Sequence, residues 1–570
     1  MRRLTVFVVI GFAYFAFAAP PGPAQTSALD GATRNDWPHY GGTPLSWRYS
    51  ALDQINTTNV QQLMAAWIFQ TGEYTENLQC TPVVVDGVMY IITPNIHVFA
   101  LDAATGALLW EYKYPKPLPA RAGGMAFLSN RGVAVNDGKV FFGTTDNYLV
   151  ALDQKTGREL WKVNVEDARQ CGCDITAAPL VVKDKVIIGG TGGDAAHRGY
   201  LTAFYEKTGR FAWRWYAIPG PGETGHETWE GDSWKFGGGA PWMTGSFDPD
   251  LNLIYWGTGN AAGDFNDNDR APRGGDKSKD TDLYTASVVA LDADTGKLRW
   301  YHQEIPDDVW DYDSSFESIL VDREVQGVMR KLLVHVNKSG LAFVLDRVTG
   351  QVVRVFSLPE VRTWVTNVTE DGKLEGRKEP QPGKTVNFCP SGGIGARSWN
   401  SMSYSPRTGY VYVPMLELCN DLYAMPSEPL EGRFHANGNI LLTLPPGRST
   451  FSHLDAWDPG TGKRIWSYPY KYVLLASVLS TAGDLVFTGT PEGEFFAVDA
   501  HTGTKLWSYQ TGAGHRGSTV TYSVDGRQYI AVTTGWQQTA AGQFVSGAFP
   551  DANFRLGSTL IVFALPKAQK

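Results

Sequence analysis

Apolar residues along this chain occur in short runs that end at residues typical of turns. Residues 81–92 read Thr-Pro-Val-Val-Val-Asp-Gly-Val-Met-Tyr-Ile-Ile, which predicts a strand, a two-residue Asp-Gly turn and a second strand. The same strand-turn-strand pattern recurs at residues 178–189, 403–413 and 482–490. A final apolar run at residues 558–565 predicts one more strand, with no partner after it in the sequence. The pattern therefore favours an all-β chain.

A second pattern, Ala-x-Asp-x-x-Thr-Gly-x-x-x-Trp, recurs along nearly the whole chain. At residues 290–300 the apolar neighbours of the Ala end one strand, Asp and Thr-Gly reverse the chain, and the Trp lies on the returning strand. Further copies occupy residues 100–110, 151–161, 203–213 (with Tyr in place of Asp), 456–466 and 497–507, and a copy without the Trp occupies residues 344–354.

This repetition indicates how the chain is organised. One unit cannot bury its own Trp, so neighbouring units must stack, and a stacked unit of this size with one Trp is typical of a β-propeller. Hairpins and repeat tails together give seven clear units, from which we expect an eight-bladed propeller. The strand at residues 558–565 is expected to complete the blade begun near the N-terminus and so to close the ring.

The first residues of the chain predict export. Residues 1–18 have a basic start, an apolar run and a small-x-small cleavage site at Ala16-Phe17-Ala18, as in a signal peptide that is removed. The alternative is an uncleaved membrane anchor, but the run is short for a membrane span and several prolines follow it. Residues 19–36, rich in Pro, Gly, Ser and Thr, are expected to be flexible, and residues 37–570 to form one propeller domain.

Composition narrows the range of functions. The net charge is -8 with no basic tract, which argues against a nucleic-acid partner. Five cysteines are too few for a disulfide framework, and the odd count leaves at least one unpaired within the chain. No Cys-x-x-Cys-His occurs, so the sequence predicts no covalently attached haem, and the ten histidines lack the spacing of a zinc site.

Three insertions interrupt the repeats, at residues 220–239, 264–282 and 362–397. Polar segments of this kind are usually solvated surface loops, and the third shows no strand pattern. The second is rich in Asp but lacks the Asp-x-Asp-x-Asp-Gly spacing of a calcium-binding loop, so we expect it to be solvated as well.

The repeat tails occur together with Thr191-Gly-Gly-Asp194, Trp256-Gly-Thr-Gly-Asn260 and Trp310-Asp-Tyr-Asp313. In this combination the chain resembles the pyrroloquinoline quinone (PQQ)-dependent alcohol dehydrogenases of the methanol and ethanol dehydrogenase family, from about Trp37 to Leu565. The resemblance implies an eight-bladed propeller with a quinone and a metal ion near its central axis.

The resemblance assigns a metal site to four residues: Asp194, Asn260, Asp311 and Asp313. Carboxylate and amide oxygens suit a hard cation. An Asp at position 313 resembles the lanthanide-dependent branch, because another carboxylate beside Asp311 favours a trivalent ion, with Ca²⁺ as the alternative. The family usually has Glu where this chain has Asp194, which is one methylene shorter.

The resemblance assigns quinone binding to six residues: Arg131, Thr176, Gly192, Gly193, Trp242 and Lys338. A tryptophan offers a flat face on which a heterocycle can stack. Arginine presents a planar fork to a carboxylate. A lysine beside the reactive carbonyl would stabilise developing negative charge.

The chain departs from the family pattern at several positions. Many members have two adjacent cysteines just before Asn-Arg-Gly, where this chain has Met125-Ala126. Gln79 stands where Glu is common, and Ser398 replaces an Asn. Cys171-Gly-Cys173 is either a different sulfur lid over the quinone or, as we favour, a reduced or locally bridged pair on a loop.

The resemblance implies an exported, periplasmic quinoprotein that oxidises a primary alcohol or a related hydroxyl compound. Asp311 would take the hydroxyl proton as general base, and hydride would pass to metal-bound PQQ. With no haem motif in the sequence, a separate cytochrome c or similar carrier is expected to remove the electrons, and no stable membrane span is expected after cleavage. Two alternatives stay open: a non-catalytic propeller scaffold of the outer-membrane assembly type, and a degenerate relative that binds quinone poorly.

Overall fold

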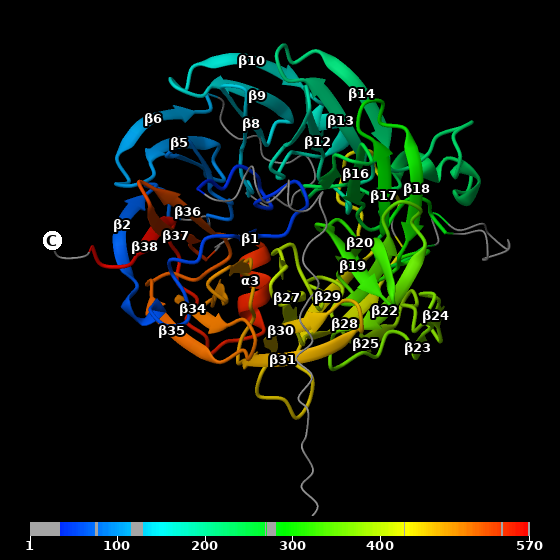
Figure 1. Ribbon diagram of the computed structural model, residues 1–570. Coiled ribbons are helices and arrows are strands. Elements are labelled where there is room, and N and C mark those ends of the chain that lie inside the picture. The colour runs from blue at the N-terminus through cyan, green and yellow to red at the C-terminus, as the bar shows by residue number, and fades with distance from the viewer. Residues whose placement is uncertain are drawn as a thin grey trace, which may run out of the picture.

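The computed structural model describes residues 35–74, 78–115, 129–267, 270, 281–426, 428–536 and 540–567. Antiparallel sheets are arranged in a ring around a central axis, which makes the molecule an all-β propeller (Figure 1). The predicted signal peptide at residues 1–18, most of the segment 19–36, and Met125-Ala126 lie outside the described residues.

Within the described ranges, eight sheets contain four or five strands, mostly consecutive in sequence. In chain order, their strands are β3 (Val83–Val85), β4 (Val88–Ile92), β5 (His97–Asp102) and β6 (Leu108–Lys113); β7 (Ala134–Asn136), β8 (Lys139–Gly143), β9 (Tyr148–Asp153) and β10 (Glu159–Asn164); β11 (Leu180–Val182), β12 (Lys185–Gly189), β13 (Tyr200–Tyr205) and β14 (Phe211–Tyr216); β15 (Ser246–Asp248), β16 (Leu253–Gly257), β17 (Ser287–Asp292) and β18 (Leu298–Gln303); β19 (Ile319–Val325), β20 (Val328–Val336), β21 (Leu341–Asp346) and β22 (Val352–Ser357); β26 (Ser403–Ser405), β27 (Tyr410–Leu416), β30 (Ser452–Asp458) and β31 (Lys463–Tyr470); β32 (Leu479–Thr481), β33 (Leu485–Gly489), β34 (Glu494–Asp499) and β35 (Lys505–Gln510), joined by β1 (Tyr49–Ser50); and β36 (Thr519–Val524), β37 (Arg527–Thr534) and β38 (Thr559–Ala564) with β2 (Met64–Gln70).

Smaller elements fill the connections between these sheets. They are the strands β23 (Asn367–Val368), β24 (Leu374–Glu375), β25 (Thr385–Phe388), β28 (Cys419–Ala424) and β29 (Gly438–Thr443), the α-helices α2 (Ala168–Cys171) and α3 (Ala540–Gly547), and the 3₁₀ helices η1 (Val60–Gln62), η2 (His226–Thr228) and η3 (Ser233–Phe236).

The tryptophan repeat joins each sheet to the next. Trp67 Nε1 donates to the carbonyl of Ala103 at 3.2 Å, and Trp110 repeats this contact one sheet further on, with Gln154 O at 3.0 Å. The indole also lies over the turn glycine of the neighbouring unit: a Cβ on Gly157, where φ is +70°, would stand 2.5 Å from the Trp110 ring. The Thr-Gly turns that face a Trp therefore need glycine both for their backbone conformation and for that ring, whereas Gly462 faces Phe356 and Arg354, from the copy that lacks the Trp. The expected stacking of units is confirmed.

The ring closes between the two ends of the chain. β38, the unpartnered strand expected from the sequence, pairs antiparallel with β2, with Met64 opposite Ala564. This confirms that the last strand completes the sheet begun near the N-terminus. The sheet consists of β2 from near the N-terminus and of β36, β37 and β38 from near the C-terminus. The ring is therefore closed by hydrogen bonds between β2 and β38, which are nearly 500 residues apart in sequence.

Two of the three insertions differ from the sequence prediction. Residues 362–397, expected to lack strands, contain β23, β24 and β25, and β25 forms a separate three-stranded sheet with β28 and β29. In the insertion 264–282, expected to be solvated, Asp264, Arg270 and Asp282 are buried. The Asp282 carboxylate lies 3.0 Å from Arg270 Nε, a buried ion pair that the polar composition of the segment concealed.

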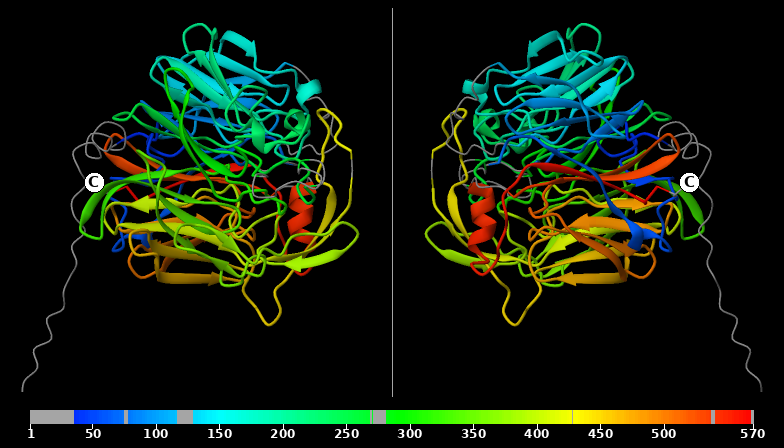
Figure 2. Two further views of the ribbon diagram at one scale, coloured as in Figure 1. Left: turned by 90° about the vertical axis from the view of Figure 1, so that its right-hand side faces the viewer. Right: turned by 90° about the vertical axis from the view of Figure 1, so that its left-hand side faces the viewer.

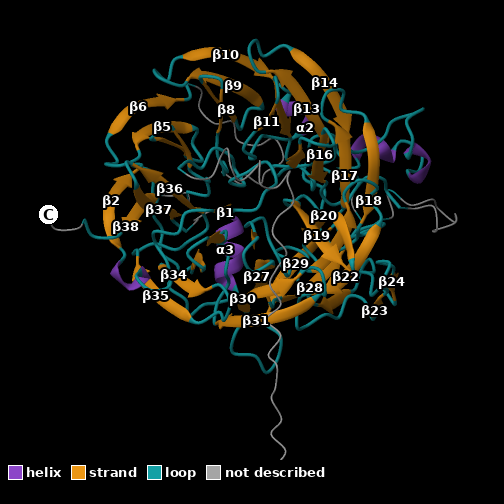
Figure 3. Cartoon of the chain, viewed as in Figure 1, coloured by secondary structure: helices purple, strands orange, loops and turns teal. Residues whose placement is uncertain are grey.

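The added elements gather on one face of the ring. Figure 2 shows α3 and the segment around β28 and β29 on the same side, and α3 contacts β29. Strands form the rim and loops fill the centre (Figure 3). Within the described part of the chain, no helix has the length and apolar character required to cross a membrane.

Candidate active site

A central pocket of about 490 Å³ is lined by loops from most of the sheets. Its walls come from the residues just before the first strand of a sheet and from those just after the second. Nine of the ten residues predicted to form the site line it: Arg131, Thr176, Gly192, Gly193, Asp194, Trp242, Asp311, Asp313 and Lys338. The tenth, Asn260, is buried directly beside them. The sequence motifs, far apart in the chain, therefore meet at one place.

Arg131 and Trp242 form one wall of this pocket. Arg131 Nη1 donates to Thr176 Oγ1 at 2.6 Å, and its backbone N–H donates to the carbonyl of Thr176 at 2.9 Å. The guanidinium carbon lies 5.0 Å from the centroid of the Trp242 ring and 5.1 Å from that of Trp399. This wall offers a flat aromatic surface beside a fixed cation, which suits a planar ligand with carboxylates.

Acidic residues gather around Lys338 in another part of the pocket. Lys338 Nζ donates to Asp311 Oδ1 at 2.6 Å and to Asp313 Oδ2 at 3.2 Å. The edge of Trp242 reaches the same group, because its Nε1 donates to Asp313 Oδ1 at 3.0 Å. The Asp311 backbone has a φ of +66°, a left-handed conformation that is uncommon for a residue with a side chain and that occurs often at active sites.

The electrostatics of this group follow from burial and crowding. Burial raises the pKa of Asp311 well above its ordinary value; Lys338 opposes the rise, and the carboxylates of Asp194 and Asp313 add to it. Burial alone would lower the pKa of Lys338, but Asp311 and Asp313 raise it above its ordinary value. The lysine is thus held as a cation, while Asp311 has a higher proton affinity than a solvated carboxylate.

Asp264 is a further acidic residue of the pocket, which the sequence analysis had placed on a solvated loop. It is 2% exposed, and its Oδ1 accepts a hydrogen bond of 2.8 Å from Asn260 Nδ2. Burial, then Asp194 and Asp311, raise its pKa well above the ordinary value. One feature of the sequence could have indicated that Asp264 is buried: it lies four residues after Asn260, between the apolar residues Ala261-Ala262 and Phe265. These three neighbours are buried as well.

The residues around Asn260 fit a hard cation. Asn260 Oδ1 is buried and has no hydrogen-bond partner among the described residues. A Cβ on Gly193 would overlap that oxygen, so only glycine leaves it room. No three acidic, histidine or cysteine side chains of the described ranges converge at metal-binding distance, and Lys338 Nζ contacts Asp311 and Asp313 instead. The donor atoms, all carboxylate or amide oxygens, are nevertheless those that Ca²⁺ or a lanthanide prefers.

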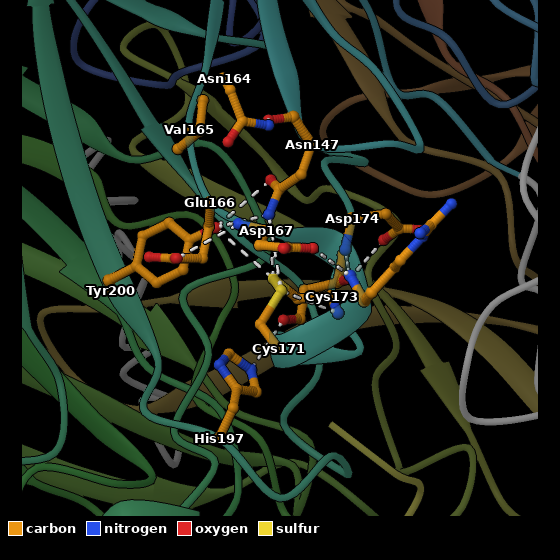
Figure 4. Close-up of a disulfide and its surroundings, with 12 residues drawn as sticks. Asn147, Asn164, Val165, Glu166, Asp167, Cys171, Cys173, Asp174, His197 and Tyr200 are labelled. Carbon is orange, nitrogen blue, oxygen red and sulfur yellow. Dashed lines mark hydrogen bonds between the residues drawn. A yellow bond between two sulfur atoms is a disulfide. The ribbon is translucent and has the colours of Figure 1, made fainter. Parts of the chain in front are cut away.

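Cys171 and Cys173 form a disulfide in the structure (Figure 4). Asn147 Nδ2 lies 3.1 Å from Cys173 Sγ, and Tyr200 packs beside it. Both cysteines are buried, and neither lines the central pocket. Of the two alternatives left open by the sequence, the locally bridged pair is therefore the one observed. A second disulfide joins Cys389 to Cys419.

Five apolar side chains of the pocket lining were not expected from the sequence. They are Phe265, Ile394, Phe434, Ile440 and Phe544, contributed by separate loops, β29 and α3. Phe434 is held by a β-bridge to Ala195, and the backbone N–H of the next residue, His435, donates to the carbonyl of Asp194 at 2.8 Å. The segment that contributes Phe434 to the pocket lining is thus attached directly to the predicted metal-binding loop.

Comparisons with known proteins agree with this geometry. Residues 37–361 and 468–530 match the family model described as "PQQ: Glucose/ethanol/alcohol dehydrogenase, beta-propeller domain". The quinohemoprotein alcohol dehydrogenase of Comamonas testosteroni is 38% identical over 553 residues, which cover 91% of this chain and 77% of that protein. The 1-butanol dehydrogenase (cytochrome c) of Thauera butanivorans is 35% identical over 533 residues, 89% of this chain and 75% of its own length.

A solved structure is similar over nearly its full length. A europium-containing methanol dehydrogenase superposes with a TM-score of 0.86 and 33% identity, covering 93% of this chain and 98% of that one. The family model spans well over half of the chain, and the relatives match about nine tenths of it. The chain therefore belongs to the family of PQQ-dependent alcohol dehydrogenases.

Proposed function

We propose that this chain oxidises a primary alcohol, or a related hydroxyl compound, to the corresponding carbonyl compound with PQQ and a bound metal ion. The observation that carries the proposal is the meeting, in one pocket, of the Arg131–Trp242 wall with the acidic group around Lys338. The quinohemoprotein alcohol dehydrogenase and the 1-butanol dehydrogenase named above support the same reaction.

The residues present fit the cofactor. The Trp242 ring would stack against the quinone, with Arg131 and Thr176 donating hydrogen bonds to its carboxylates. A Cβ on Gly192 would meet the His197 ring and one on Gly193 would overlap Asn260 Oδ1, so this pocket-lining loop requires glycine at both positions. When bound beside a metal ion, PQQ supplies the hydride acceptor that protein side chains lack.

Asp311 would act as the general base. Its buried carboxylate lies in the pocket and has a raised pKa, which increases its ability to hold a proton taken from the substrate hydroxyl. Lys338 orients that carboxylate through the 2.6 Å hydrogen bond, and it is also placed to stabilise negative charge that develops nearby.

The metal ion would be held by Asp194, Asn260, Asp311 and Asp313, and we favour a lanthanide over Ca²⁺. Asp264 adds another carboxylate to the same region. Several buried carboxylates raise one another's pKa, and a trivalent ion offsets that repulsion more than a divalent one. The europium-containing structure supports this preference.

Three further features complete the proposal. Electrons would leave to a separate cytochrome c or similar carrier, as the name of the Thauera relative indicates for that protein. The signal-like residues 1–18 favour a periplasmic location. The eight sheets of four or five strands support eight blades.

Reconstitution of the purified protein tests the central proposal. The protein is mixed with PQQ and either Ca²⁺ or a light lanthanide, and bound quinone is followed by absorbance. Alcohols, aldehydes and sugars are then supplied with an artificial electron acceptor. We expect a bound-quinone spectrum that is reduced by primary alcohols. A scaffold protein would bind no quinone, and a degenerate relative would bind it without reducing it, so either result would overturn the proposal.

A further inference from the structure

Arg516 occupies the place in its sheet that Arg131 occupies in another. Arg131 lies three residues before β7 and Arg516 three residues before β36, and each of these strands is an edge strand of a four-stranded sheet. Thr176 and Trp242 lie four residues before β11 and β15. All of these residues line the central pocket. The repeat of the propeller therefore directs Arg516 toward the same space as the predicted quinone-binding residues.

The surroundings of Arg516 hold its guanidinium within the pocket wall. The side chain is 3% exposed, and its guanidinium carbon lies 5.3 Å from the centroid of the Trp536 ring. Burial, with a contribution from the positive charge of Arg131, lowers the pKa of Arg516 to about 10. Like charges held close in a buried place disfavour each other, and an anion placed against both would offset that cost.

A neutral side chain completes this part of the pocket. Gln79 is buried and lines the pocket, and its Oε1 has no hydrogen-bond partner in the described ranges. In the acidic group, burial and then Lys338, Asp194 and Asp313 shift the pKa of Asp311. Arg131 and Arg516 thus place two cations on the pocket lining, whereas Lys338 contacts Asp311 and Asp313.

We propose that Arg516 and Arg131 together bind carboxylate groups of the quinone, and that Arg516 is a cofactor-binding residue which the sequence motifs do not identify. The inference rests on the proposed function, because it takes PQQ as the ligand. Two guanidinium forks can each donate a pair of hydrogen bonds to a carboxylate. Placed in sheets far apart in sequence, they would fix the in-plane orientation of a flat ligand that a stacking tryptophan alone leaves free to rotate.

The experiment measures the dissociation constant of PQQ by quenching of tryptophan fluorescence, with saturating metal and without substrate. Arg516→Gln is compared with the parent and with Arg516→Lys. Arg299→Gln, which removes the same charge from a side chain that is 61% exposed, is the matched control. We expect Arg516→Gln to bind PQQ about ten- to hundredfold more weakly, since a charge-assisted hydrogen bond is lost. Arg516→Lys should be intermediate, and Arg299→Gln should match the parent.

PQQ trimethyl ester distinguishes carboxylate binding from a structural role. We expect the ester to bind the parent and Arg516→Gln equally, because it has no carboxylate for the guanidinium to hold. If Arg516→Gln does not fold, Arg516→Lys takes its place, with the same ratio of acid to ester affinity as the readout. A folded variant that binds PQQ as tightly as the parent, or that loses acid and ester binding equally, overturns the inference. A parent protein that binds no PQQ overturns the proposed function as well.

Discussion

Replacing Asp311 by Asn tests the proposed mechanism most directly. The carboxylate is buried in the central pocket, with Oδ1 2.6 Å from Lys338 Nζ. The amide of Asn has nearly the same shape and can still accept that hydrogen bond, but it cannot take the hydroxyl proton. We expect kcat to fall by about 10²–10⁴, the usual contribution of a positioned base. This is about 3–5 kcal/mol in activation free energy.

The Asp311→Asn protein should remain folded. Lys338 keeps its hydrogen bond to Asp313 Oδ2 at 3.2 Å, so its charge is not left alone in the interior. Breaking a buried ion pair costs about 3–5 kcal/mol when the remaining charge has no other partner. With a second carboxylate in place, we expect the free energy of unfolding, measured in urea, to fall by less than this.

The assay must separate loss of the base from loss of the metal. Alcohol oxidation is measured with an artificial acceptor at saturating PQQ and metal, while absorbance and elemental analysis report the bound quinone and ion. Asp194→Asn is the control, because it removes a predicted metal ligand but no base. Excess metal should restore activity to Asp194→Asn but not to Asp311→Asn. A fully loaded Asp311→Asn enzyme with kcat near that of the parent would remove Asp311 from the proposed mechanism.

Four further predictions concern the rest of the molecule. Asp313→Ser should lose the preference for a light lanthanide over Ca²⁺ in reconstitution; equal response to lanthanide would contradict the proposed ligand role. Mild reduction of the Cys171–Cys173 disulfide should leave kcat nearly unchanged, because the bond lies outside the pocket lining, and a large reversible loss would disagree. Phe434→Ala should raise KM for 1-butanol about three- to tenfold but hardly affect methanol, since each buried methylene contributes about 0.8 kcal/mol. Burial alone would lower the pKa of His453, but its hydrogen bonds with buried carboxylates raise the pKa to about 9. The protonated His453 should therefore stabilise the folded state fully below about pH 6.5, and this contribution should disappear as pH rises through 9. His453→Gln should flatten the dependence of Tm on pH over that range.

The repeating part of the fold could be predicted from the sequence because its causes are local. The Asp-x-x-Thr-Gly segment makes its own turn: Asp102 Oδ1 accepts hydrogen bonds from the backbone N–H and the hydroxyl of Thr105. The Trp four residues after each Gly needs only the next copy of the same unit as its partner. The pairing of β2 with β38 could be predicted because the apolar run at residues 558–565 has no partner after it in the sequence.

The motifs at the site could also be recognised in the sequence, but the residues that surround them in the pocket could not be predicted. Asp264 lies in a segment that reads as polar and solvated, and the two carboxylates that add to the rise in its pKa, Asp194 and Asp311, are distant in sequence. Arg516 has no recognisable motif, and only its place before β36 shows that it faces the pocket. The apolar part of the pocket lining combines side chains from separate loops, β29 and α3, so no single stretch of sequence indicates it.

The arrangement of charge in the pocket explains why both parts of the site are needed. The acidic group has Lys338 as its counter-charge, and two of its carboxylates, Asp264 and Asp311, have strongly raised pKa values, so negative charge is in excess there. Two positive charges lie near each other at Arg131 and Arg516, and burial, together with the charge of Arg131, lowers the pKa of Arg516. A cation beside the acidic group and an anionic ligand against the arginines would each relieve one of these imbalances. A metal ion and a quinone that carries carboxylates have these charges, so the binding of each should strengthen the binding of the other.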